Sequence, residues 1–363
     1  MVAKTYDAKA RGIRTGMPVW EARKLFPDAV CLSADFRYYG QVSGALFAIL
    51  RRYSPEVEAY SIDEGFLGMD GLRSLWGKGF GAIADHMRES VRRELGVSVS
   101  VGVSVTRTLA KMASEYGKPD GSTVVPGRRI GSFLARLGLR AIPGIGGNRE
   151  ALLNKFGVAS ALDFAHARRE LMQRLLGKGG VKLWLELNGE SVMPLELSAR
   201  TPKSMARTAS LGQVTGDRRV IATHLTRHAM RLASELVAKR LLTQQVKVFL
   251  RRKSFEAVSM HVRLDCASNN DFRLSCAVRS ALEALYDPEC LYRACGVVAG
   301  RISREEDATM DLFGVMRADA RQGELLRTVA AVNRRYGREM LTMAIGSQKW
   351  QGSRFQYPMF VAS

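Results

Sequence analysis

The stretch that decides the fold is Tyr60-Ser61-Ile62-Asp63-Glu64, which places two adjacent carboxylates behind an apolar run. Side chains alternate between the two faces of a strand, so Asp63 and Glu64 would diverge within one. Where a strand ends or turns, both carboxylates can reach the same divalent cation. On the dipeptide alone an exposed Asp-Glu turn is the simpler interpretation, because short motifs carry a high false-positive risk. The surrounding sequence decides between the two.

Composition indicates several domains and a polyanionic partner. A chain of 363 residues corresponds to about two to four domains at ~100–200 residues each. Lysine and arginine total 55 against 35 aspartate and glutamate, giving a net charge of +20. Such an excess indicates nucleic acid phosphate, with an anionic membrane surface as the rival. No stretch approaches the ~18–20 apolar residues of a spanning helix, and the N-terminus has no apolar signal-peptide core.

Cysteine and histidine usage does not indicate a zinc site. The five cysteines are irregularly spaced and form no C-x-x-C pair, which favours reduced thiols in a cytosolic protein. His224 and His228 stand four residues apart, but the glutamate of an H-E-x-x-H helix is absent. We interpret both histidines as surface residues.

The first third of the chain predicts an antiparallel sheet with helices on one face. Two short strands over 57–69 flank the acidic pair, and an amphipathic helix follows over 80–95. A strand over 97–105 contains Gly102, where another backbone can pass closely. A helix over 106–116 then leads to Lys118-Pro119-Asp120-Gly121, a turn by composition.

The middle of the chain is helical around Ile142-Pro143-Gly144-Ile145-Gly146. This is the helix-hairpin-helix pattern, whose glycines let backbone N–H groups approach phosphate oxygens in front of a helix N-terminus. A glycine-rich turn between packed helices is the alternative. Residues 176–180 are interpreted as a second, degenerate hairpin.

The last third predicts a polar tether and a small α+β domain. Residues 198–210 are polar and basic and are interpreted as the tether. The domain that follows is expected to contain helices over 220–242 and 271–286 and strands over 246–251, 257–264 and 295–302. Beyond Arg304 only a helix over 322–336 is expected.

Taken in order, the acidic motif, the strand and helix that lead to Lys118, and the Pro143-Gly144-Ile145-Gly146 hairpin resemble the Y-family translesion DNA polymerases. The C-terminal half is most similar to the UmuC branch, notably at Val332-Asn333-Arg334-Arg335-Tyr336-Gly337-Arg338. The resemblance implies an α+β multidomain fold with an incomplete ferredoxin-like palm, small fingers, a helical thumb and an α+β little finger. The expected segments are fingers and adjoining palm helices 1–55, palm 56–127, thumb 128–190, linker 191–208, little finger 209–304 and C-terminal tail 305–363.

The resemblance also implies a DNA polymerase that uses two Mg²⁺ ions, primer-template DNA and a dNTP. Asp63 would bridge the two metals, and Glu64 would hold the metal nearest the primer 3′-hydroxyl. Lys118, Tyr6 and Lys9 would bind the triphosphate; Lys9 replaces a frequent arginine, so a bidentate fork becomes a point charge. For Lys118 an exposed turn lysine is the alternative. Gly144, Ile145 and Gly146 would contact DNA.

The chain departs from the family pattern at its start. Family members begin with a strand that carries a further metal-binding aspartate, and Met1 aligns after that strand, so about 40 family-typical residues have no counterpart. We therefore expect this polypeptide to bind DNA but to polymerise slowly or not at all.

Two further partners follow from the resemblance. Thr309-Met310-Asp311-Leu312-Phe313 is similar to the peptide that docks such polymerases on the sliding clamp, with threonine in place of the usual glutamine. Leu312 and Phe313 would enter the clamp pocket, and a C-terminal packing element is the alternative. UmuD-like and RecA-like proteins of the SOS response are expected partners, in the cytoplasm and away from membranes.

Two other functions compete with polymerisation. A non-catalytic DNA- and clamp-binding accessory protein fits the absent strand, whereas the intact Asp63, Glu64 and Lys118 oppose it. A helix-hairpin-helix glycosylase or lyase would need a catalytic residue after the hairpin, where 147–156 offer only Lys155. A palm-like nucleotide cyclase would leave the hairpin and the charge unexplained.

Overall fold

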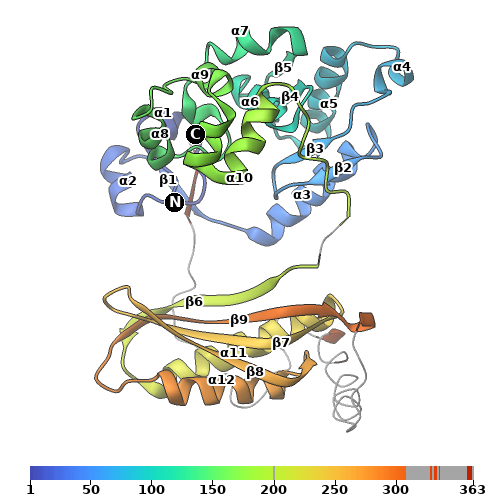
Figure 1. Ribbon diagram of the computed structural model, residues 1–363. Coiled ribbons are helices and arrows are strands. Elements are labelled where there is room, and N and C mark those ends of the chain that lie inside the picture. Colours follow the sequence, from blue (N-terminus) through green and yellow to red (C-terminus); the bar gives the residue numbers. More distant parts are fainter. Residues whose placement is uncertain (199–200, 308–327, 329–330, 333–334, 336–357, 362–363) are drawn as a thin grey trace. The chain divides into compact units, whose positions relative to one another are not determined.

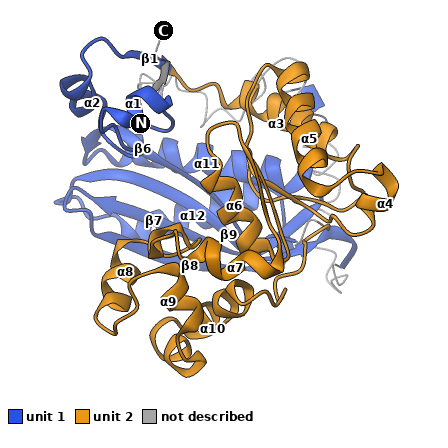
Figure 2. Cartoon of the chain, turned by 90° about the horizontal axis from the view of Figure 1, so that it is seen from above, with its two compact units in different colours: residues 1–32, 200–363 blue, residues 33–199 orange. Residues whose placement is uncertain are grey.

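The computed structural model describes residues 1–198 and 201–307, together with 328, 331–332, 335 and 358–361. These residues form two compact units, Ser33–Ala199 and Met1–Leu32 with Arg200–Ser363 (Figure 2). The two units are described in turn. No helix among the described residues is long and apolar enough to cross a membrane.

The unit Ser33–Ala199 combines two short strand pairs with helices (Figure 1). Its strands are β2 (Val57–Ala59), β3 (Gly65–Leu67), β4 (Val101–Ser104) and β5 (Ser122–Val125). Its helices are α3 (Phe36–Leu50), α4 (Leu72–Trp76), α5 (Phe80–Leu95), α6 (Arg107–Tyr116), α7 (Ile130–Leu134), α8 (Gly147–Asn154), α9 (Ala161–His166) and α10 (Arg169–Leu187). Single 3-10 turns lie at Gly127–Arg129 and Leu139–Ala141.

The strands pair two by two. β2 and β3 form an antiparallel hairpin in which Glu58 lies opposite Phe66, and β4 runs parallel to β5 with Val101 opposite Ser122. Within the described residues no strand ladder joins the hairpin to the β4–β5 pair. The expected two strands around the acidic pair are confirmed. The antiparallel sheet expected for the first third of the chain is wrong at β4, which runs parallel to β5. The strand expected over 97–105 begins only at Val101, and its partner β5 was not predicted.

Gly102 sets how closely α6 approaches β4. A Cβ atom at this position would lie 2.1 Å from the carbonyl oxygen of Ala110 and 2.3 Å from the backbone nitrogen of Ser114. Real Cβ atoms do not approach backbone so closely, because van der Waals repulsion rises steeply at such distances. The expectation that another backbone passes close to Gly102 is confirmed.

Two apolar clusters hold this unit together. One joins α3, α4 and α5 through buried side chains such as Phe47, Leu50, Ile83 and Val91. The other joins α6 to the helices that follow, through Leu109, Met112, Phe133, Leu153 and Phe164 among others. Because α6 and its neighbours share the second cluster, the helical segment has a rigid attachment to the strand pair β4–β5.

The degenerate second hairpin expected at residues 176–180 falls on a break between two helical segments. These residues lie inside α10, where Gly177 interrupts the helix with a φ of 67° and a ψ of −158°. Glycine alone adopts such a backbone conformation without strain. The position is therefore a kink between two helical segments.

The other unit contains a four-stranded antiparallel sheet with the order β6-β9-β7-β8. Helices α11 and α12 cover one face of this sheet (Figure 1). The elements are β6 (Ser204–Thr215), α11 (Arg218–Ala238), β7 (Leu241–Arg252), β8 (Ala257–Ser268), α12 (Asp271–Leu285) and β9 (Tyr292–Arg304). The unit also holds α1 (Tyr6–Ala10) and α2 (Val19–Leu25), and β1 (Val30–Ser33), at its boundary, pairs with β10 (Pro358–Val361).

The face of the sheet opposite α11 and α12 is flat at its centre, because a glycine there carries no side chain. A Cβ atom on Gly296 of β9 would lie 2.5 Å from the Phe249 ring on β7 and 2.6 Å from the Thr208 methyl group on β6. Phe249 and Thr208 both stand opposite Gly296 in the strand register. The glycine thus lets the ring lie across the strand between them.

The tether expected over 198–210 is wrong from Ser204 onward, because β6 begins there. Met205 and Leu211 point into the core, but Ser204, Ala206, Thr208 and Ser210 lie on the exposed face. An edge strand with one covered face and small polar residues on the other has few apolar side chains. Its composition therefore looks like that of a linker.

The interpretation of His224 and His228 as surface residues is also wrong. Their exposed fractions are 8% and 5%, and they lie on the face of α11 that carries Ile221, Leu225 and Leu232 into the core. Both histidines share the helical phase of these apolar residues. Their burial could have been predicted from the helical period of the apolar residues.

Candidate functional site: an acidic turn beside helix α6

The two carboxylates of the sequence motif lie in a tight turn. β2 ends at Ala59 and β3 begins at Gly65, and the backbone N–H groups of Tyr60 and Ser61 both donate to the carbonyl of Glu64, at 3.0 and 2.9 Å. The turn closes because these two bonds satisfy backbone groups beyond the last strand pair. Asp63 and Glu64 thus protrude from the end of a hairpin, as the sequence predicts.

Asp63 is oriented from within the turn. The Ser61 hydroxyl donates to Asp63 Oδ1 at 2.6 Å, and the Asp63 N–H donates to the Ser61 oxygen at 3.3 Å. This reciprocal arrangement is typical of local side chain–backbone bonds in turns. Asp63 remains exposed to solvent, so its second carboxylate oxygen is accessible to an external cation.

Glu64 is bound by a lysine that the sequence did not single out. Lys111 Nζ, from the middle of α6, donates to Glu64 Oε1. The same ammonium lies 5.4 Å from the centroid of the Tyr60 ring, within the range of a cation–π contact. The sequence shows Lys111 within Leu109-Ala110-Lys111-Met112, but nothing in its spacing indicates a partner 47 residues earlier.

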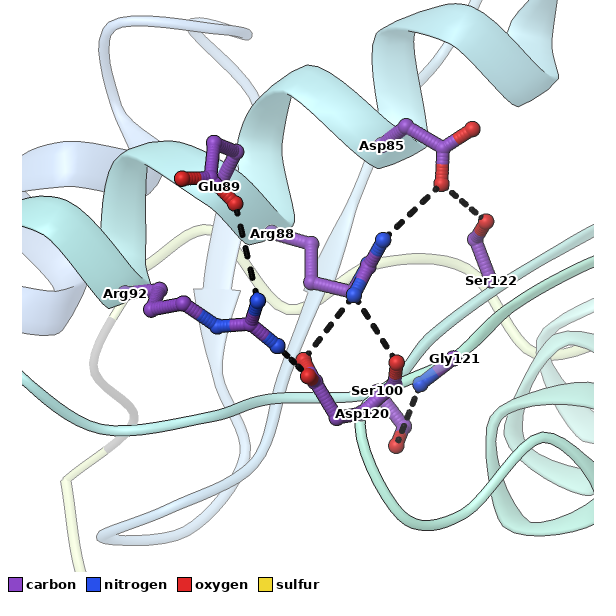
Figure 3. Close-up of polar contacts among 8 residues, drawn as sticks. All are labelled: Asp85, Arg88, Glu89, Arg92, Ser100, Asp120, Gly121 and Ser122. Atoms are coloured by element: carbon purple, nitrogen blue, oxygen red, sulfur yellow. Dashed lines mark hydrogen bonds and ion pairs between the residues drawn. The ribbon is translucent and has the colours of Figure 1, made fainter.

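Lys118 follows the end of α6. Two residues after it, Asp120 is held in place by arginines of α5 (Figure 3). Arg88 Nη1 donates to the Asp120 carbonyl at 2.8 Å and to Asp120 Oδ1 at 3.0 Å. Arg92 forms a second ion pair with the same carboxylate. Asp120 has a φ of 52°, in the left-handed region that aspartate tolerates better than most residues. The turn is therefore fixed by charge-assisted bonds.

A second contact ties the α5 helix to the strand after this turn. Ser122 Oγ donates to Asp85 Oδ1 at 2.5 Å, and Asp85 pairs in turn with Arg88 at 3.6 Å (Figure 3). Lys118 itself pairs with Glu115 at 2.5 Å and is partly exposed. Its position at the start of a rigid turn suits a lysine that binds an anion from solvent.

The expected triphosphate residues Tyr6 and Lys9 belong to the other compact unit. They lie on α1, where Lys9 Nζ is 5.8 Å from the Tyr6 ring centroid and Tyr6 is 53% exposed. Their relation to Asp63, Glu64 and Lys118 stays a prediction.

The predicted hairpin at Pro143 has the backbone that the motif requires. Gly144 has a φ of 86°, and its carbonyl accepts a bond from Arg149 Nη1 at 2.8 Å. Gly146 caps the N-terminus of α8 without a side-chain hydrogen bond, so the first N–H groups of the helix keep their capacity for an external acceptor. Ile145 is 4% exposed, so a ligand at this turn would meet its backbone and not its side chain.

The described residues contain no group of three or more His, Cys, Asp or Glu side chains that could hold a metal ion. The acidic turn therefore contributes two carboxylates and no more. Mg²⁺ is often bound by one or two carboxylates completed by water and substrate phosphates. The donor set thus fits a magnesium ion that shares its ligands with a nucleotide.

Comparison with known proteins supports one family. The model of the impB/mucB/samB family matches residues 1–115, and that of its C-terminal domain matches residues 202–312. A DNA polymerase IV of Methanoculleus marisnigri is 33% identical over 69% of this chain and 69% of its own length. A DNA polymerase IV of Moorella thermoacetica is 30% identical over 95% of this chain and 86% of its own length. The chain belongs to the Y family of DNA polymerases.

Other relatives agree with this assignment. DNA polymerase IV 2 of Mesorhizobium japonicum is 35% identical over 73% of this chain, which spans 64% of that relative's length. Among solved structures, a Y-family DNA polymerase chimera of Dbh and Dpo4 superposes with a TM-score of 0.69 at 22% identity, covering 82% of this chain and 86% of the other. Likeness at this identity supports the fold, and the expected palm, thumb and little-finger architecture is confirmed.

Two sequence-based predictions lie outside the described residues. These are the clamp-docking peptide with Leu312 and Phe313, and most of the helix over 322–336 together with most of the UmuC-like sequence over 332–338, which overlaps the end of that helix.

Proposed function

We propose that this chain carries out template-directed DNA synthesis across damaged bases, with Asp63 and Glu64 as its metal-binding carboxylates. The observation that supports this most is the acidic turn: a hairpin presents both carboxylates at one end, and α6, whose Lys111 pairs with Glu64, ends just before Lys118. Family membership supplies the reaction class, which is nucleotidyl transfer from a dNTP to a primer end.

Each residue of the site has a proposed task. Asp63 and Glu64 would hold Mg²⁺, which when bound would supply a positive charge for the phosphate oxygens and the attacking hydroxyl. Lys118 would bind the triphosphate as a point charge from its rigid turn. Tyr6 and Lys9 would contact the same triphosphate, and the backbone N–H groups at Gly144 and Gly146 would donate hydrogen bonds to a DNA phosphate.

Primer extension by the full 363-residue chain tests this function. Asp63→Asn and Glu64→Gln keep the shape of the turn but remove its charge, and each is expected to lower extension by at least about 100-fold. Asp70→Asn, an exposed carboxylate just after β3, is the matched control and should extend primers like the unaltered chain. Equal activity in all four proteins would remove the acidic turn from the mechanism.

We further propose that extension by this chain is slow. With two carboxylates and no third His, Cys, Asp or Glu beside them in the described residues, a pair of cations would be held weakly, because like charges need several anionic ligands to approach within about 4 Å. Normal turnover with Mg²⁺ would contradict this. A large gain on replacing Mg²⁺ by Mn²⁺ would support it, because nitrogen and oxygen sites generally bind Mn²⁺ more readily.

The same two-carboxylate set favours one alternative, a non-catalytic accessory protein that binds DNA and the sliding clamp. The two functions differ in one measurement: the accessory protein would bind primer-template DNA with salt-sensitive affinity and show no extension that Asp63→Asn abolishes. Clamp binding through Leu312 and Phe313 is common to both and is tested by a clamp pull-down of the Leu312→Ala, Phe313→Ala double variant.

Membership of the UmuC branch is a narrower proposal, based on the sequence Val332-Asn333-Arg334-Arg335-Tyr336-Gly337-Arg338. It entails dependence on UmuD-like and RecA-like partners in the SOS response. Lesion bypass that increases on addition of such partners would support it, and full bypass by the chain alone would contradict it.

A further inference from the structure

The strand that leads into the acidic turn carries a buried carboxylate with no part in metal binding. Glu58 of β2 is 6% exposed, and both of its oxygens are bonded. Oε1 accepts from Arg107 Nη2 at 2.6 Å, and Oε2 accepts from the backbone N–H of Glu196 at 2.9 Å. A buried carboxylate is costly unless its oxygens are paired in this way.

Arg107 contacts three parts of the unit at once. Besides Glu58, its guanidinium lies 4.3 Å from the ring centroid of Phe66 and 5.1 Å from that of Tyr60. Its Nη1 also donates to the carbonyl of Pro194 at 3.3 Å. The planar guanidinium can stack on rings while its edge donates hydrogen bonds, which a lysine cannot reproduce. One side chain thus links the acidic hairpin, the start of α6 and the segment around residue 194.

That segment, residues 192–196, is called the strap below. A second carboxylate, Glu186, is fully buried at the end of α10. Its Oε1 accepts from the N–H groups of Val192 and Met193 at 2.9 and 3.0 Å, and its Oε2 accepts from the N–H of Thr108 at 2.9 Å. The strap is therefore fixed at both ends to the first turn of α6, by Glu186 at one end and by Glu58 with Arg107 at the other.

The acidic hairpin depends on these contacts because it lacks a strand neighbour. Within the described residues β2 pairs only with β3, so its links to α6 are side-chain contacts from Arg107 and Lys111. Arg107 makes the more buried ion pair of the two, with side-chain exposures of 16% for the arginine and 7% for Glu58. A change in the position of the strap therefore acts on the hairpin through the same guanidinium.

We infer that Arg107 is a positioning residue that couples the acidic turn to the strap, so that the two segments loosen and tighten together. The strap ends shortly before the boundary between the compact units at Ala199. The coupling thus gives the chain between the units a mechanical connection to the carboxylates. It goes beyond the proposed polymerase activity and does not depend on it.

Hydrogen exchange of the full chain, followed by mass spectrometry without DNA, metal or nucleotide, tests the coupling. Arg107→Met should speed exchange in the strap and also in residues 60–67, each by about tenfold or more, because both segments lose a shared buried contact. Arg93→Met, a substitution of a 68% exposed arginine on α5, should leave both segments unchanged. Exchange in α5 monitors the fold.

The reciprocal experiment acts from the strap. Glu196→Pro removes the backbone N–H that donates to Glu58, 138 positions away in sequence, and it should speed exchange in residues 60–67. Ser198→Pro, just beyond the strap, is the control. If Arg107→Met does not fold, Arg107→Lys keeps the charge but loses the fork and should give a smaller change in both segments. If Arg107→Met speeds exchange in only one of the two segments, the coupling is overturned. The same holds if Glu196→Pro speeds exchange in the strap alone.

Discussion

Lys111 of α6 forms an ion pair with Glu64 of the acidic turn, while its ammonium lies 5.4 Å from the Tyr60 ring centroid. The lysine thus occupies one oxygen of a carboxylate proposed to bind a metal ion. A metal cation that binds Glu64 must therefore displace the Lys111 ammonium and is repelled by its positive charge.

We therefore expect Lys111→Met to bind Mn²⁺ more tightly than the unaltered chain, by about three- to tenfold, because a nearby positive charge is removed. Titration of free Mn²⁺ by electron paramagnetic resonance measures this affinity. Lys118→Met, which removes a lysine paired with Glu115 instead, is the control. Weaker binding by Lys111→Met would mean that the lysine orients Glu64 and does not compete for it.

Arg88 should influence nucleotide binding through the turn that carries Lys118. Loss of its two bonds to Asp120 in Arg88→Met frees a residue held at a φ of 52°. We expect the KM for dNTP to rise about fivefold with little change in kcat, because Lys118 is then less firmly placed to bind the triphosphate. Single-nucleotide incorporation measures both constants, with Arg93→Met as control. A fall in kcat at constant KM would contradict this role.

Stability of the sheet-containing unit should fall in mild acid. Burial, followed by the charge of His224 and nearby arginines, lowers the pKa of His228 from 6.5 to about 4. Since the folded pKa lies below the unfolded one, the unfolded state binds more protons between these values, and stability rises with pH across that window. The loss begins below pH 6.5 and reaches about 3 kcal/mol near pH 4.

Urea denaturation at pH 7.5 and pH 5 measures this dependence. His228→Leu should reduce the difference between the two pH values, because it removes the group that titrates. His261→Leu, on the exposed side of β8, should leave the difference as it is. An equal pH dependence in all three proteins would assign the acid sensitivity to other groups.

Gly102 should not tolerate a side chain. Gly102→Ala places a methyl group against the Ala110 carbonyl and the Ser114 nitrogen, and the resulting shift of α6 should cost about 1–3 kcal/mol. Gly44→Ala, inside α3 with open space around it, should instead stabilise by about 0.5–1 kcal/mol. Urea denaturation followed by circular dichroism compares the two. Equal effects would show that the close contact can relax.

The elements that sequence predicted well are those with local causes. The helix over 80–95 is correct at both ends, because its apolar residues repeat with helical spacing and Gly96 ends it with a φ of 68°. The acidic hairpin was predicted from its short strands and central turn. In contrast, the helix expected over 220–242 ends at Ala238. The prediction ran too far because Leu241 and Leu242 continue the apolar pattern, although they begin β7.

The parts that sequence could not supply are long-range pairs. Glu58, Arg107 and Glu186 look like ordinary charged residues in sequence, and only the fold brings each to its partner over 49 to 138 positions. Lys111 was visible within a helix, yet its contact with Glu64 depends on how α6 meets the hairpin. The local spacing of residues carries no information about such long-range contacts. Because the charges are buried, the loss of any one contact should destabilise the fold.

The level row formed by Thr208, Gly296 and Phe249 has a consequence for how variation at this surface is interpreted. Any side chain at position 296 would lift the Phe249 ring away from the strand beneath it. The ring lies on the uncovered face of the sheet, so the core under α11 and α12 would remain packed. A substitution at position 296 should therefore leave the folding of the unit intact. Its effect on activity would then show whether the protein needs this surface to be flat.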